Sequence, residues 1–273
     1  MKLRFEAALG GKNFSDIAPE VLLRDIVEIP AEMDVQKSRR ATRPGQIITG
    51  KTRTALAVRL VYNIRAYDVA RRAQVRDLVA EWACGGGWLT VNTRPGKRLY
   101  VVCETPPNVE SSLKWAQDLS MTLYAYAQPY WEKEDEVTVS IPAEWSNTHG
   151  MYYGAYVINP DGNVDEVPVS FLAWNTSDDK VLTHLKVMVW NTFFDLRDIA
   201  VEPGGMFYGL VQARYDENDI LSIRDEMTGV SLMANRTAES SDDLLARCGK
   251  DNQIHVYADA PCRVQLEARG RYL

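Results

Sequence analysis

The sequence predicts a mainly β protein with one principal helix: an α+β N-terminal domain followed by a C-terminal antiparallel β-sandwich. One stretch, residues 69–82, has clear helical periodicity, and short apolar runs typical of strands surround it. From residue 137 onward, strand-like runs alternate at short intervals with turns rich in Gly, Pro, Asn and Asp, a pattern typical of a β-sandwich. The 273 residues are enough for two domains.

The predicted helix begins after Asp68, a good N-cap residue, and ends at the triple glycine 85–87. Four apolar residues follow the i, i+3, i+4, i+7 spacing of one helical face, and we expect them to form its core face: Val75, Leu78, Val79 and Trp82. Charged residues occupy the wetter side: Arg71, Arg72, Arg76 and Glu81.

Six apolar runs are predicted as strands of the N-terminal domain: residues 3–9, 21–29, 55–63, 87–92, 98–103 and 113–127. The last run closes this domain and ends abruptly at Pro129, Tyr130 and Trp131. An acidic connector, 132–136, follows, and composition changes there. We therefore predict domains at 1–131 and 137–273.

Residues 34–53 form a polar, basic segment with Pro44 and Gly45 near its middle. The segment has too little apolar surface to lie in the core of its own domain. Read as a hairpin or arm, it folds back at Pro44 and Gly45 and projects outward, where water or a neighbouring chain satisfies its backbone. A mobile surface loop is the alternative.

Charge is unevenly distributed along the chain. Residues 37–98 contain fourteen Lys and Arg and three acids, which gives this segment a charge of +11. Because the whole chain has a net charge of −6, the remaining residues together carry −17. Such asymmetry is typical of nucleic-acid binding, or of copies that attract one another, basic part to acidic part. The basic segment has no interleaved aromatics and no nucleic-acid motif, which argues against sequence-specific nucleic-acid binding.

No stretch predicts a membrane span or a signal peptide, so we expect a chain that folds in a cytosol. The four cysteines show no metal-site spacing and are expected to be reduced, with a bridge between Cys248 and Cys262 left open. Among the tryptophans, only Trp131 and Trp145 are expected to be partly exposed.

Motifs for catalysis are absent from the sequence, which contains no GxGxxG, Walker loop, GxSxG or HExxH. The histidines are far apart and are expected to be structural: His149, His184 and His255. Two adjacent acid pairs, 178–179 and 242–243, could serve a glycosidase or bind calcium, although turn and cap roles are commoner. We expect no catalysis, no cofactor and no metal.

The order of elements resembles the N-terminal domain of phage distal tail proteins: strands, an arm, a strand, a helix that ends in glycines, two strands, and a long strand that closes on residues 128–131. The second half is similar to the galectin-like C-terminal sandwich of that family. The segments that carry this likeness are residues 219–224, 229–230, 244–245, 252–256 and 264–272.

This resemblance implies a structural protein of the virion tail tip or baseplate, assembled in the host cytoplasm. The N-terminal domains would form a six-membered ring that links the tail tube and tape-measure proteins to the tail-tip hub protein. The arm at 34–53, called a belt in that family, would pack on the next copy, and the C-terminal domains would face outward and can hold receptor-binding proteins. We expect six cations to supply this subunit contact: Lys37, Arg39, Arg40, Arg43, Lys51 and Arg53.

Two other functions stay open at this point. The second domain could be a lectin-like adhesion module that binds a host glycan through exposed aromatics. It could also be a glycan hydrolase, which needs two loop carboxylates facing one cleft.

Overall fold

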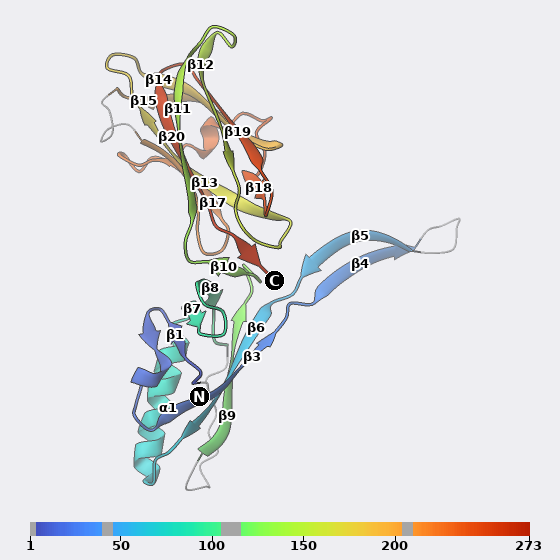
Figure 1. Cartoon of the computed structure of the whole chain (residues 1–273), viewed down its shortest axis with the longest axis vertical. Coiled ribbons are helices and arrows are strands. Elements are labelled where there is room, and N and C mark those ends of the chain that lie inside the picture. Colours follow the sequence, from blue (N-terminus) through green and yellow to red (C-terminus); the bar gives the residue numbers. More distant parts are fainter. Residues whose placement is uncertain (1–3, 40–45, 105–115, 204–209) are drawn as a thin grey trace. The chain divides into compact units, whose positions relative to one another are not determined.

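The computed structural model describes residues 4–39, 46–104, 116–203 and 210–273. The chain divides into two compact units, unit 1 up to Glu132 and unit 2 from Lys133 to Tyr272. The predicted fold class is confirmed: the described chain is mainly β, with one α-helix (Figure 1). The strand pairs whose register is described run antiparallel. Within the described ranges no helix is long and apolar enough to cross a membrane.

Besides a two-stranded hairpin within residues 33–53, unit 1 contains two sheets. A three-stranded sheet has the order β3 (Val21–Ile29), β6 (Leu56–Ile64), β9 (Ala116–Ala125). A second sheet continues through β2 (Lys12–Asn13), β1 (Ala7–Leu9), β7 (Gly87–Val91), β8 (Lys97–Val101) and β10 (Trp131–Lys133). The predicted run 113–127 is a strand over Ala116–Ala125, and its first residues lie outside the described part.

The core of unit 1 is built around aromatic side chains from distant segments. Phe14, from the short helix η1 (Phe14–Asp16), packs edge-on against Tyr62 and Trp82, with ring centroids 5.4 and 5.0 Å apart. The Trp82 indole N–H donates to the carbonyl of Lys12 at 2.8 Å. Edge-to-face aromatic pairs add to the free energy of area burial, so this cluster fixes the helix against the sheets.

The helix α1 (Val69–Cys84) begins as predicted, because the Asp68 carboxylate accepts hydrogen bonds from the backbone N–H groups of residues 70 and 71. Its core face is only partly as predicted. Val75, Val79 and Trp82 are buried, but Leu78 is 38% exposed. Leu78 precedes Val79 by about 100° around the helix, which places it at the edge of the apolar stripe.

The opposite edge of the stripe also differs from the prediction. Arg72, expected on the wet side, is buried, and its Nε has no hydrogen-bond partner among the described residues. Arg71 pairs with Glu20, at 2.8 Å between Nε and Oε1. Periodicity alone cannot place residues at the edges of a stripe, because the width of the covering elements decides whether they are buried.

In unit 2 the strand order is β15, β14, β19, β12, β11, β20, β13, β16, β17, with β18 beside β13. The bounds are β11 (Val137–Ser146), β12 (Met151–Ile158), β13 (Glu166–Asn175), β14 (Leu182–Val189), β15 (Thr192–Val201), β16 (Leu210–Tyr215), β17 (Leu221–Asp225), η3 (Met233–Asn235), β18 (Leu245–Arg247), β19 (Asn252–Ala258), β20 (Cys262–Ala268) and β21 (Arg271–Tyr272). The strands form two layers, one of β12, β19, β14 and β15 and the other of β20, β13, β16 and β17. β11 takes part in both layers, since its residues 137–143 pair with β20 and its residues 144–146 pair with β12.

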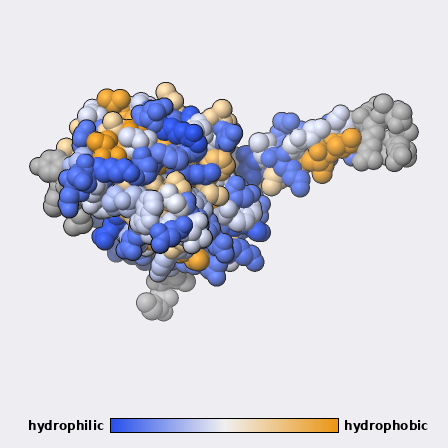
Figure 2. Space-filling model, turned by 90° about the horizontal axis from the view of Figure 1, so that it is seen from above, coloured by the Kyte–Doolittle hydropathy of each residue, from blue (hydrophilic) through white to orange (hydrophobic). Residues whose placement is uncertain are grey.

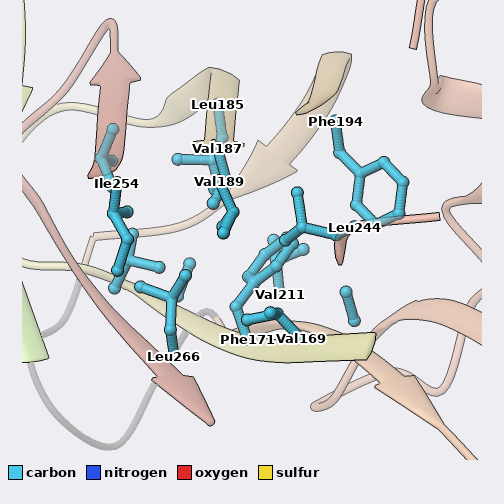
Figure 3. Packing of buried hydrophobic residues seen from close by; sticks show 14 of the residues in the cluster. Val169, Phe171, Leu185, Val187, Val189, Phe194, Val211, Leu244, Ile254 and Leu266 are labelled. Atoms are coloured by element: carbon cyan, nitrogen blue, oxygen red, sulfur yellow. The ribbon is translucent and has the colours of Figure 1, made fainter. Parts of the chain in front are cut away.

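The core of unit 2 lies between these two layers. Figure 3 shows Leu185, Val187 and Ile254 facing Phe171 and Leu266 across the interior. All five side chains are at most 2% exposed. Each such side chain contributes about 1.5–3 kcal/mol by leaving water, so the alternation of buried and exposed residues along the strands is what holds the layers together.

Candidate subunit interface

The basic segment is an ordered antiparallel hairpin, formed by β4 (Met33–Arg39) and β5 (Gln46–Arg53). It extends away from the sheets of unit 1 (Figure 1). The hairpin rather than the loop alternative is therefore the conformation of this segment, which we call the arm. The predicted fold-back at Pro44 and Gly45 lies outside the described residues.

The strand register divides the arm into two faces that differ chemically. Residues directly opposite each other in an antiparallel pair project to the same side. One face carries three pairs, Met33 with Arg53, Val35 with Lys51, and Lys37 with Ile48. The register shift leaves Thr49 as the extra residue of β5, and this bulge moves Ile48 onto the cationic face.

The other face is mainly polar and carries no cation among the described residues of the arm. It presents Asp34 with Thr52, Gln36 with Gly50, and Ser38 with Ile47. The arm is therefore two-sided: one side combines cations with apolar side chains, and the other offers mainly small polar groups.

The six cations predicted to supply a subunit contact have different positions. Lys37 and Lys51 are exposed, and the Arg53 guanidinium carbon lies 5.9 Å from the ring centroid of Tyr130 within its own unit. The backbone register places Arg39 opposite Gln46. Arg40 and Arg43 lie outside the described residues. The subunit contact itself stays a prediction.

Apolar side chains on the arm are the feature that the charge pattern does not reveal. Met33, Ile47 and Ile48 are 45%, 45% and 55% exposed. Figure 2 shows hydrophobic atoms gathered on the arm among hydrophilic neighbours. The sequence signal was the pair of adjacent isoleucines, Ile47 and Ile48, in an otherwise polar segment.

The residues that close unit 1 form a buried cluster. Trp131, expected to be partly exposed, is completely buried, and Pro129 is buried beside it in the chain. Glu132 accepts two hydrogen bonds from the Arg98 guanidinium, at 2.9 and 3.1 Å. Arg98 also lies over the ring of Trp88 at 3.9 Å. The Glu132 carboxylate and the Trp88 indole thus both hold the Arg98 guanidinium at the end of this unit.

The three histidines each have a partner in unit 2. His184 Nε2 lies 2.7 Å from Asp195 Oδ1. His255 Nδ1 lies 2.8 Å from the Tyr153 hydroxyl, and His149 stacks on the same tyrosine ring with centroids 4.1 Å apart. Sequence distance did not indicate that Tyr153 would bring two of the histidines together, because strand pairing decides this.

The adjacent acids take part in turns. The Ser177 hydroxyl donates to Asp179, and Asp242 is fully exposed, 3.9 Å from Arg236. No group of three or more His, Cys, Asp or Glu in the described ranges is placed to hold a metal ion. Trp145 is 58% exposed, as expected, with its ring edge-on to Tyr152.

Comparison with known proteins identifies the fold. No protein-family model matches the sequence, and no curated protein matches it. The chain is similar to the crystal structure of SPP1 Dit (gp 19.1), described as a paradigm of the hub adsorption apparatus in phages that infect Gram-positive bacteria. The TM-score is 0.66 at 12% identity, over 98% of this chain and 99% of that chain.

Two structures of the phage p2 baseplate in its activated conformation are also similar. With strontium, the TM-score is 0.51 at 7% identity, over 97% of each chain. With calcium, the TM-score is 0.52 at 7% identity, over 99% of this chain and 98% of that chain. The likeness therefore extends over both units, and the chain has the fold of phage distal tail and baseplate proteins.

Proposed function

We propose that this chain is a non-catalytic structural protein of a phage tail tip that assembles into a closed, six-membered ring. The observation that carries the proposal is the arm: an ordered hairpin that presents apolar and cationic side chains which its own unit leaves uncovered. The fold shared with tail and baseplate proteins over both units supports the same conclusion.

The arm suits association with another copy of the chain. Its two strands pair only with each other among the described residues, so its outer edges and its apolar face are open to a neighbour. The arm and the receiving surface are different parts of one chain, which makes the contact head-to-tail. Such contacts form closed rings when the rotation closes. The excess of cations in the arm and of acids elsewhere favours this pairing.

In this proposal the ring lies in the virion between the tail tube and tape-measure proteins on one side and the tail-tip hub protein on the other. Unit 2 is a docking domain that can hold receptor-binding proteins, and assembly takes place in the host cytoplasm. The arm acts by holding the next copy, so the function needs no reacting group and no cofactor.

The test is the mass and shape of the purified full chain. Light scattering after size exclusion, together with negative-stain images over a range of concentrations, should show closed rings of six copies. Replacing the six arm cations by glutamine should shift the protein to smaller species. If the natural chain is monomeric at all concentrations, alone and with a tail-tube protein added, the proposal is wrong.

A second candidate function is glycan binding by unit 2, favoured by the exposed Trp145 indole beside Tyr152. An exposed indole face can stack on a sugar ring. Binding of the full chain to a glycan array, lost on Trp145→Ala, would support this function. If the chain binds no glycan on the array, glycan binding is excluded as its function.

A further inference from the structure

A groove beside α1 provides a receiving surface for the arm. It has a volume of about 560 Å³ and lies between the C-terminal part of α1 and the turn that joins β1 to β2. This volume falls in the range of sites that accommodate a small ligand or a few side chains. The groove is lined by four apolar residues, two acids, two other polar residues and four glycines: Leu9, Ile17, Leu78, Trp82, Asp16, Glu81, Lys12, Asn13, Gly10, Gly11, Gly85 and Gly86.

Leu78 is the apolar side chain of α1 that its own unit does not cover. The helix buries Val75 and Val79, one turn apart, but leaves Leu78 facing this groove at 38% exposure. Glycines keep the floor open, since a Cβ added at Gly10, Gly11 or Gly85 would meet no atom within 4 Å. The groove is thus an accessible surface of mixed apolar and polar character and not a packing gap.

The electrostatics of the groove favour a cation. Asp16 and Glu81 are exposed, and neither forms an ion pair with any residue in the described ranges. The last turn of α1 contains no basic residue. Its free carbonyl groups therefore add negative potential at the same end of the helix. Lys12 offsets one of the two carboxylates, so the groove has a net negative charge.

The arm carries the matching pattern on one face. Lys37 and Ile48 stand directly opposite each other in the register and project to the same side, with Lys51 further along that face. An isoleucine beside a lysine is complementary to a leucine beside a carboxylate. In Figure 1 the arm leaves unit 1 on the side away from α1, so the two surfaces cannot meet within one chain and can meet between neighbours.

We infer that the groove at the end of α1 is the docking site for the arm of a second copy of the chain; this inference rests on the proposed ring. Ile48 of the arm packs on Leu78 and Ile17, and Lys37 pairs with Asp16 and Glu81. This contact accounts for the exposed Leu78, for two acids that form no ion pair within the described ranges, and for the cationic face of the arm.

Charge exchange tests the pairing. The variant Asp16→Lys/Glu81→Lys and the variant Lys37→Glu/Lys51→Glu should each weaken self-association by about tenfold or more, and combining all four should restore most of it. The matched control makes the same charge change elsewhere, at the exposed acids Glu144 and Glu217 of unit 2, and should leave self-association unchanged.

A steric variant keeps the test independent of charge. Gly85 has φ −74°, a conformation that any residue adopts, so Gly85→Gln fills the groove without backbone strain. It should weaken self-association by about tenfold, whereas Gly85→Ala should not. A disulfide test adds direct evidence: Ile48→Cys with Leu78→Cys, in a Cys84→Ser background, should crosslink copies into a ladder that ends in a closed species.

The outcomes separate this inference from the proposed function. Suppose that rings form and the arm variants disrupt them, but the groove variants associate normally and the cysteine pair does not crosslink. The arm then docks elsewhere, so this inference is wrong, although the proposed ring is still supported. If the natural chain never associates, the proposed function fails first. Rescue by the four-fold charge exchange, together with the crosslink, establishes the groove as the docking site.

Discussion

The double substitution Ile47→Ser/Ile48→Ser gives the sharpest test of self-association through the arm. Ile48, on the cationic face, is 55% exposed, and Ile47, on the other face, is 45% exposed. A neighbour that covers the cationic face therefore buries about half an isoleucine side chain, worth about 0.8–1.5 kcal/mol for each subunit contact. Since 1.4 kcal/mol is a tenfold change in an equilibrium constant, self-association should weaken by about four- to twelvefold.

The fold should not change, because both isoleucines lie on the surface of the single chain and surface substitutions usually stay within about 0.5 kcal/mol. Sedimentation velocity over a range of concentrations measures the association, and thermal unfolding checks the fold. Ile220→Ser, at a side chain 62% exposed in unit 2, is the matched control. If the double variant and the control associate like the natural chain, the arm does not bury its apolar face against a neighbour, and the reasoning fails.

Three further predictions concern the units themselves. Glu132→Gln removes the carboxylate that accepts two hydrogen bonds from Arg98 and should destabilise unit 1 by about 2 kcal/mol in urea unfolding, while unit 2 is unaffected. A hydrogen bond from Arg71, in the first turn of α1, lowers the pKa of the Glu20 carboxyl below its ordinary value of 4.5. Its contribution to stability is therefore present above pH 4.5 and lost as pH falls through the lowered value, so the melting temperatures of the natural chain and Glu20→Gln should differ near neutral pH and converge in acid. Burial raises the pKa of the Cys262 thiol to about 12, so a thiol reagent at mild alkaline pH should modify the exposed Cys84 in the native protein and Cys262 only after unfolding. Equal rates at the two thiols would contradict the described packing.

The open question of a disulfide is answered by the structure. Cys248 and Cys262 are both buried and both carry free thiols. Spacing along the chain could not decide this, because a disulfide requires two Cβ atoms within a few ångströms of each other, which is a property of the fold.

Local structural features could be predicted from the sequence alone. The N-cap at Asp68, the glycine stop after Cys84 and the alternation of the strands each depend on residues a few positions apart. Their physical causes are short-range: a side chain that satisfies free N–H groups, a left-handed residue at Gly86 with φ 58°, and the two-residue period of a strand.

Other features depended on distant parts of the chain. Trp131 is buried although its neighbours in sequence are polar, and Leu78 is exposed although it fits the helical pattern. Burial is decided by what covers a residue, and the covering atoms come from segments far away in sequence.

The sequence by itself determined the fold class, the position and N-cap of α1, and the existence of a basic segment without a core of its own. Only the tertiary structure decided that this segment is a hairpin whose bulge at Thr49 puts Ile48 beside Lys37, and that Leu78 lines an open, acidic groove. The physical reason is that periodicity and capping act within a few residues, whereas strand register and burial are set by partners that only the folded chain brings together.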